Sequence, residues 1–127
     1  IQGCIGILRP IPKRILTDVS VLKVPTSMNV HQKPTYESYN LANIHVQNTN
    51  QVVKSTDNTN VVLRSILFFD CRLSKPVALD IWALERSANE IGASMKIEYD
   101  GDTYTVEMVD LVPDDQGKPH HYELGLV

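Results

Sequence analysis

Residues 95–127 decide the fold, and they read MKIEYDGDTYTVEMVDLVPDDQGKPHHYELGLV. Asp100 and Gly101 lie between two alternating runs, and an Asp-Gly pair supplies the positive φ angles of a two-residue hairpin turn. This turn predicts a β-hairpin over residues 95–106 with one apolar and one polar face. The expected partners are Tyr99 with Asp102, Ile97 with Tyr104, Met95 with Val106, Lys96 with Thr105 and Glu98 with Thr103.

A third strand is predicted after this hairpin. Residues 113–119 are rich in proline, glycine and aspartate, which is typical of a turn. The chain then alternates as a strand with one buried face should, so three antiparallel strands end the chain. Tyr122, Leu124 and Leu126 lie on the buried face, and His121, Glu123 and Gly125 lie on the other.

Two further strands are predicted upstream. Residues 15–24 alternate as one strand, Pro25 and Thr26 end it, and residues 27–38 form a loose polar connection. Residues 41–47 alternate again, with Ala42, Ile44 and Val46 on one side. His45 is therefore expected on the surface of that strand.

A long polar loop and a central strand follow. Residues 48–60 read NTNQVVKSTDNTN, with only Val52 and Val53 apolar, and a connection of this length is usually functional or disordered. Residues 61–71 read VVLRSILFFDC, which predicts a central strand buried on both faces and a buried thiol at Cys71.

A helix of about three turns is predicted over residues 76–91. Apolar residues recur there at helical spacing, Pro76 suits a first turn, and Gly92 suits a C-terminal cap. Trp82 lies beside the apolar stripe, so the helix can cover an open end of a barrel or pack on a neighbour. The stripe consists of Ile81, Leu84, Ala88 and Ile91.

Charge is distributed unevenly along the 127 residues, whose net charge is −3. The first 33 residues carry five bases and one acid, whereas residues 95–127 carry eight acids and two bases. The two ends are either solvated faces or complementary surfaces that dock copies or partners. The negative net charge argues against general nucleic-acid binding.

Cysteine content and hydropathy restrict the compartment. Cys4 and Cys71 are too few and too far apart for a disulfide framework or a zinc site, so a reducing cytosol is expected. The apolar runs are shorter than the roughly 18 to 20 residues of a membrane span, and the first residues lack the charged region of a signal peptide. We expect a soluble protein with no membrane association.

The sequence contains one cluster that resembles a chemical site, formed by His120, His121 and Glu123. Two ligands from one strand do not make a metal site, and the sequence does not place His31 or His45 to complete it. Phosphate loops, nucleophile elbows and zinc-protease helices are missing from the sequence. We expect neither an enzyme nor a cofactor.

Four stretches, in this order and spacing, resemble the small minor capsid proteins of tailed phages and prophages of Gram-positive bacteria. They are IPKRIL (11–16), SILFFD (65–70), MKIEYDGDTYTV (95–106) and PHHYELGLV (119–127). These proteins belong with the head-completion, or stopper, proteins of the head-to-tail connector. Residues 74–91 depart from the pattern, because relatives are expected to have a shorter connection there.

The resemblance implies a structural role in the virion neck. The expected fold is mainly β: a small antiparallel barrel of about six strands, with one short helix and a long polar loop, in one domain over residues 1–127. Twelve copies, or a multiple of six, would form a ring below the portal that retains packaged double-stranded DNA. The other implied partners are portal or adaptor proteins and a tail-completion protein, and assembly would occur in the host cytoplasm.

The loop over residues 48–60 is the best match to the segment that some relatives project into the channel as a plug. Lys54 is its one base and Asp57 its one acid, so blockage would be mainly steric. The candidate channel residues are Asn48, Asn50, Val52, Val53, Lys54, Asp57 and Asn60.

Ring joining is expected between the two charged ends of the sequence. Lys13 and Arg14 would meet Glu98, Asp102 and Asp110 of the next copy in a head-to-tail contact. Alternatively, residues 122–127, including Tyr122 and Leu124, would add to the sheet edge of a neighbour.

Three other functions remain open. A tail-completion or tail-terminator protein also forms rings from small domains. An OB-like module would bind single strands through its tyrosines, although the acidic C-terminal third opposes this. An enzyme would have to use His120, His121 and Glu123. The tyrosines are Tyr36, Tyr39, Tyr99, Tyr104 and Tyr122.

Overall fold

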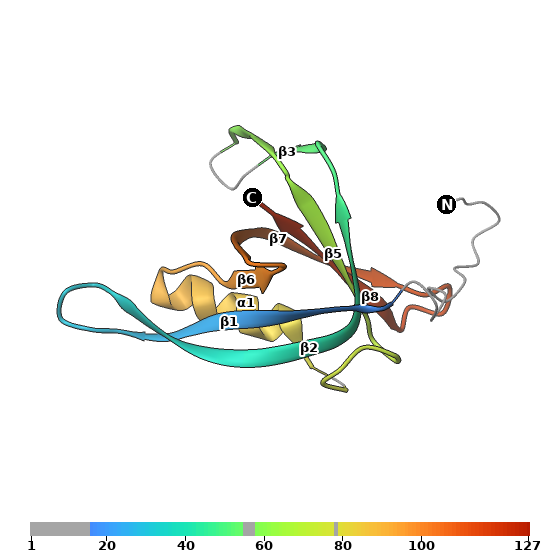
Figure 1. Cartoon of the computed structure of the whole chain (residues 1–127), viewed down its shortest axis with the longest axis horizontal. Coiled ribbons are helices and arrows are strands. Elements are labelled where there is room, and N and C mark those ends of the chain that lie inside the picture. Colours follow the sequence, from blue (N-terminus) through green and yellow to red (C-terminus); the bar gives the residue numbers. More distant parts are fainter. Residues whose placement is uncertain (1–15, 55–57, 78) are drawn as a thin grey trace.

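The structure is a computed structural model, in which residues 16–54, 58–77 and 79–127 are described (Figure 1). Six strands of the described chain form one antiparallel sheet in the order β1-β2-β5-β8-β7-β6, and pairing of β1 with β6 closes it into a barrel. Strands β3 and β4 form a separate hairpin. The predicted β-barrel with one helix is confirmed. The bounds are β1 Asp18–Met28, β2 Pro34–Asn48, β3 Val52–Lys54, β4 Asn60–Val62, β5 Ser65–Asp70, α1 Ile81–Ile91, β6 Lys96–Tyr99, β7 Asp102–Pro113 and β8 Pro119–Leu126.

The β6–β7 hairpin has the predicted turn and register. Asp100 and Gly101 adopt φ angles of 51° and 82°, which is the left-handed conformation that this turn requires. Tyr99 lies opposite Asp102, and the pairing continues in the predicted order toward residue 96. The apolar face is buried, since Met95 and Ile97 are 2% and 0% exposed.

Strand β8 differs from its prediction because both of its faces are buried. It pairs with β5 on one edge and β7 on the other, and His121 and Gly125 are buried together with the inward-facing residues. Leu63 and Met108 cover the outer face at Gly125. A Cβ there would lie 2.6 Å from Met108 Cγ and 2.9 Å from Leu63 Cδ1, so only glycine fits without movement.

The predicted end of the first strand at Pro25 is wrong, as is the loose connection over residues 27–38. β1 continues to Met28, a turn follows, and β2 begins at Pro34, so that the two strands form a long ribbon that projects from the barrel (Figure 1). The Asn29 side chain holds the turn by accepting hydrogen bonds from the N–H groups of His31 and Lys33, both at 2.9 Å. Because neither face of the projecting part is covered, its sequence lacks the apolar alternation on which the prediction relied.

A bulge in β2 changes which residues face the core. Asp18 pairs with Ile44 and Val19 with Ala42, which leaves Asn43 unpaired in the left-handed conformation at φ 54°. The bulge resets the alternation, so Leu41 and Ile44 are the fully buried residues. The prediction that Ala42 shares the core side with Ile44 is therefore wrong.

The predicted continuous strand over residues 61–71 is also wrong, because it is interrupted after β4. The Leu63 N–H donates to the Gln51 carbonyl at 2.9 Å, and the Arg64 N–H donates to the Leu126 carbonyl at 2.8 Å. These bonds turn the chain from the β3–β4 hairpin into β5. Within β5 residues 65–69 alternate between buried and half-buried, Asp70 is buried, and Cys71 lies half-buried after the end of the strand.

Helix α1 begins later than predicted, at Ile81 rather than residue 76. The preceding connection is attached to the β2 bulge, because the Ser74 hydroxyl donates to the Asn43 carbonyl and Lys75 pairs with Ala42. Asp80 caps the helix by accepting from the Ala83 N–H at 3.0 Å.

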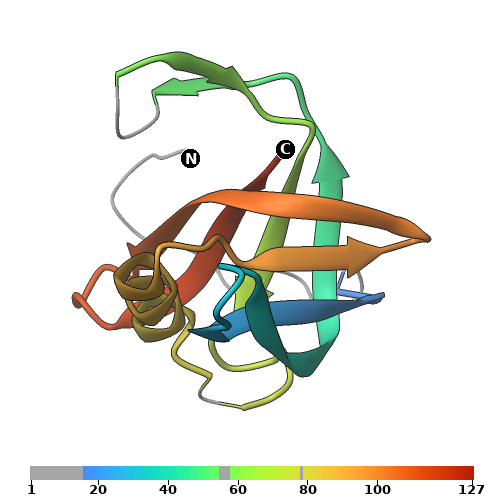
Figure 2. The same cartoon turned by 90° about the vertical axis from the view of Figure 1, so that its left-hand side faces the viewer.

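The other end of α1 and its packing follow the prediction. Gly92 ends the helix at φ 86°, with its N–H on the carbonyls of the last turn. Ile81 and Ala88 enter the core, and the helix lies against β1 and β7 (Figure 2).

Replacement of Gly125 tests the packing over β8. We expect Gly125→Ala to lower the free energy of unfolding by about 1–3 kcal/mol, as overpacking does in other cores. The measurement is urea unfolding followed by circular dichroism. In a double-mutant cycle, Met108→Ala should recover part of the loss, and strictly additive effects would contradict the proposed clash.

Candidate functional site

The predicted channel loop is a short hairpin that projects from the barrel. Val52 pairs with Val62, Val53 with Val61, and Lys54 with Asn60. Figures 1 and 2 both show it extending beyond the six-stranded barrel. Asn48 is an exception among the candidate channel residues, because it pairs with Ser65 inside the barrel sheet. Asn50, Val52, Lys54 and Asn60 are exposed, Val53 is half-buried, and Asp57 lies outside the described residues.

One face of this hairpin is apolar and exposed. Val52 and Val62 lie directly opposite each other, and each is 56% exposed. Val62 was not predicted to be exposed, because residue 61 onward was assigned to a buried central strand. The sequence does contain an indication of this hairpin, because a pair of valines lies on each side of the polar stretch.

The acidic residues predicted for ring joining do not form one patch. Glu98 and Asp102 lie in the same β6–β7 hairpin, where the Glu98 carboxylate is 3.0 Å from the Lys23 ammonium of its own chain. Asp110 lies about 25 Å further along β7, given the rise per residue of a strand. Lys13 and Arg14, the expected basic partners, lie outside the described residues.

Tyr122 and Leu124 are not available as surface contacts. They are 6% and 0% exposed inside the barrel, and the Tyr122 hydroxyl donates to Asp80 Oδ1 at 3.3 Å, which connects β8 to the start of α1. Both edges of β8 are already paired, and Val127 pairs with Thr105. Addition of residues 122–127 to a neighbouring sheet is therefore incompatible with the closed barrel.

His120, His121 and Glu123 form a buried chain of hydrogen bonds. His120 Nδ1 lies 2.7 Å from His121 Nδ1, and His121 Nε2 lies 2.9 Å from the Glu123 carboxylate. His120 and His121 are 5% and 8% exposed, which corrects the expectation that His121 faces solvent. Within the described part of the chain, no group of three or more His, Cys, Asp or Glu residues is arranged to hold a metal ion.

Two neutral imidazole rings, each carrying one proton, account for these hydrogen bonds. If His121 Nε2 donates to Glu123, its Nδ1 accepts from His120 Nδ1–H. The buried His120 Nε2, which has no protein partner, then carries no proton. The arrangement links His120, His121 and Glu123 at the start of β8.

Two further aromatic sites have local partners. His45 stacks on Phe68 at 5.9 Å between centroids, with Asp18 at 3.8 Å, so it is half-buried rather than a free surface histidine. The Arg64 guanidinium lies 4.4 Å above the Tyr104 ring. With Tyr122 buried and Tyr104 covered, the tyrosines do not provide the shared stacking platform that an OB-like module needs.

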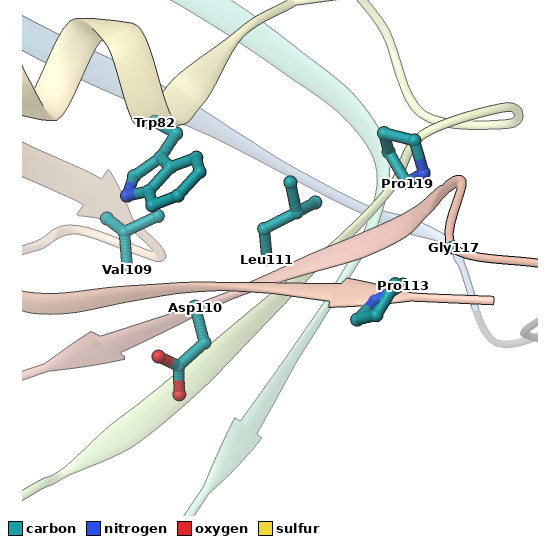
Figure 3. Close-up of a pocket in the computed structure, with 7 residues that line it drawn as sticks. All are labelled: Trp82, Val109, Asp110, Leu111, Pro113, Gly117 and Pro119. Carbon is teal, nitrogen blue, oxygen red and sulfur yellow. The ribbon is translucent and has the colours of Figure 1, made fainter.

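A groove of about 330 Å³ lies between the start of α1 and the β7–β8 turn (Figure 3). Trp82, Val109 and Leu111 point toward one another in it, while the Asp110 carboxylate points to the other side of β7. Trp82 is 51% exposed although it is the one tryptophan of the chain. Pro113, Gly117 and Pro119 complete the lining.

These features define a class of protein: a small closed β-barrel that presents two projections and an apolar groove. No helix in the described residues is long and apolar enough to cross a membrane.

The comparisons identify the family. The model of the family described as Minor capsid protein matches residues 12–126, and the chain belongs to this family of phage virion proteins. Comparisons with curated proteins and with solved structures found no match. Membership in this family favours a structural role in the virion over catalysis.

Titration of Tyr122 tests its burial. Burial first, and then the charge of Asp80, raise the pKa of Tyr122 to about 12. Because the folded-state pKa lies above the unfolded value, the protonated phenol stabilises the fold below pH of about 10, and this contribution is lost as pH rises toward 12. We expect Tyr122→Phe to remove the most alkaline component of the tyrosinate absorbance titration.

The control for this titration is Asp80→Asn, which keeps a capping side chain and removes the charge. It should move the last component to lower pH without removing it. Ionisation of all tyrosines near pH 10 in the wild-type protein would contradict the buried position of Tyr122.

Proposed function

We propose that this protein is a head-completion subunit of the phage neck. Copies of it form a ring below the portal, retain the packaged double-stranded DNA and offer the surface to which the tail docks. The observation that carries the proposal is the β3–β4 hairpin, which projects from a closed barrel in a member of the Minor capsid protein family. This hairpin is the proposed channel-closing segment.

The construction of the hairpin suits a reversible plug. Its base is held by the bonds from Leu63 to Gln51 and from Arg64 to Leu126, whereas β3 and β4 contact mainly each other. A segment with few buried contacts can move at low free-energy cost. Repetition around a ring then lets many small hairpins block a channel together and withdraw when DNA is ejected.

The chemistry of the hairpin fits a channel that DNA traverses. Lys54 is the one charged side chain among its described residues 49–54 and 58–62. Contact with DNA would therefore be mainly steric, with one cation per copy to attract phosphate. The exposed Val52 and Val62 can pack against the same residues of a neighbouring hairpin and exclude water from the closed ring.

The proposed partners are further copies, the portal or adaptor ring, and the tail-completion protein. We propose twelve copies or a multiple of six, located in the virion neck after assembly in the host cytoplasm. Lys13 and Arg14 of one copy are proposed to meet Glu98 and Asp102 of the next, with Asp110 as a separate contact.

Mass measurement tests the role as a connector. We expect the protein mixed with the portal ring from the same phage to give a complex containing copies in a multiple of six, by native mass spectrometry. The control is Lys13→Glu with Arg14→Glu, which should weaken ring joining if opposite charges hold it. A chain that ignores the portal would refute the proposal. A complex that forms only on isolated tails would assign the chain to tail completion instead.

Shortening the hairpin tests the plug. Replacement of residues 54–60 by Asn-Gly keeps the Val52–Val62 and Val53–Val61 pairs and closes them with a two-residue turn. We expect the variant ring to join the portal normally while most heads lose their DNA, counted as filled and empty heads by electron microscopy. The control is Lys54→Ala, which should leave most heads filled. Full retention of DNA by the shortened variant would refute the plug.

A further inference from the structure

We propose that the ribbon tip of one copy docks in the groove beside Trp82 of a second copy. The ribbon tip is defined as residues 26–38, the part of the β1–β2 ribbon beyond the barrel. The inference rests on the proposed ring, because it names the joint between neighbouring copies. This joint is distinct from the contact of Lys13 and Arg14 with acidic residues.

The ribbon tip exposes apolar side chains that the fold does not cover. Val30 is 92% exposed at the turn, and Met28 and Tyr36 are 39% and 38% exposed on the strands beside it. β1 pairs with β6 only through residues 21–23, and β2 pairs with β5 only from Ile44 onward. The tip is therefore a two-stranded ribbon whose outer edges and apolar side chains are free to contact a partner.

The ribbon tip is also ordered in advance of any contact. Asn29 fixes the turn through three of its groups: its side chain accepts from residues 31 and 33, its carbonyl accepts from Gln32 at 3.0 Å, and its N–H donates to Lys33 at 3.0 Å. The hydroxyls of Ser27 and Thr35 lie 2.7 Å apart across the two strands. A preformed projection loses less conformational entropy on binding than a flexible loop does.

The groove offers a matching receptor. Trp82 is half-exposed above Val109 and Leu111, and tryptophan is the residue type most enriched at the energetic centres of interfaces. A cavity of about 330 Å³ has room for a side chain such as Val30 with part of its turn. Nothing in the described chain fills this space.

The ribbon tip and the groove lie in different halves of the molecule. Figure 1 shows the ribbon tip at one end of the long axis and the β7–β8 turn, which borders the groove, at the other. The copy that inserts its tip therefore leaves its own groove open for the next copy. Such a contact between different surfaces generates a ring when the rotation closes.

Charge favours the same pairing. The ribbon tip carries Lys33 and His31, with Glu37 further down the strand, whereas the turn beside the groove carries Asp114 and Asp115 against Lys118. Hydrogen bonds from the backbone of Lys118 and Gln116 lower the pKa of Asp114, so that carboxyl is charged at neutral pH. The cation of the turn, Lys33, thus approaches an acidic rim.

Complementary variants test the joint. Val30→Asp disrupts the ribbon tip of a copy and leaves its groove unchanged. Trp82→Ala disrupts the groove and leaves the ribbon tip unchanged. We expect each variant alone to be monomeric and the two mixed together to form a 1:1 dimer by native mass spectrometry. Val19→Asp is the matched control, because Val19 is 66% exposed but lies about 30 Å from the turn along β1, and this variant should associate like the wild type.

Tryptophan fluorescence reports the same joint in solution. In the mixture only the Val30→Asp copy contains a tryptophan, and its emission should shift to shorter wavelength when the Trp82→Ala copy is added. Each single substitution should weaken self-association about thirtyfold. A mixture that remains monomeric at concentrations where the wild type associates would overturn the inference. So would wild-type emission that is unchanged from about 1 μM to about 1 mM.

Three results separate this inference from the proposed function and from another occupant of the groove. If both variants join the portal ring with wild-type stoichiometry, the inference is wrong and the connector role stands. If the wild type ignores the portal but the mixed variants dimerise, the connector role is wrong and the joint stands. If removal of residues 1–15, rather than dilution, changes Trp82 emission, the groove holds the first residues of its own chain and the inference is wrong.

Discussion

The barrel closes through three residue pairs between β1 and β6, and most other features depend on this short ladder. β6 has 4 residues while β1 and β2 have 11 and 15, so the two long strands extend past the point of closure. Backbone groups beyond that point can pair only with each other, which produces the projecting ribbon. Closure also removes the free edges of β8, so this strand cannot add to the sheet of another chain.

Helix α1 is positioned by the barrel rather than by its own sequence alone. The connection before it is held by the Asp70 carboxylate, which accepts from the N–H groups of Arg72 and Leu73, and by Ser74 on the bulge carbonyl of Asn43. Asp80 then caps the helix and receives the Tyr122 hydroxyl from β8. The bulge, the connection and the cap therefore act as one unit that fixes Trp82 beside β7.

Strands, turns and helix ends were predictable from the sequence where one residue pair sets a turn or where one face of the element is covered. Asp100 and Gly101 determined the β6–β7 register, and Gly92 determined the end of the helix, because both positions need a left-handed backbone. The ribbon was missed because it has no covered face, and its turn uses Gln32 at φ 60° where a glycine would have been a signal. The burial of His121 and the groove beside Trp82 depend on segments distant in sequence, which pattern and spacing do not reveal.

The same five-residue turn joins β1 to β2 and β7 to β8, and only its side chains differ. Asn29 and Asp114 each accept from the N–H groups two and four residues later, and the fourth residue of each turn has a positive φ. The second position is Val30 in one turn and Asp115 in the other. Because the backbone is alike, the two turns differ in surface chemistry. The β1–β2 turn is apolar and basic, and the β7–β8 turn is acidic. Two unlike turns with complementary chemistry favour a head-to-tail contact, in which one turn of a copy faces the other turn of the next copy.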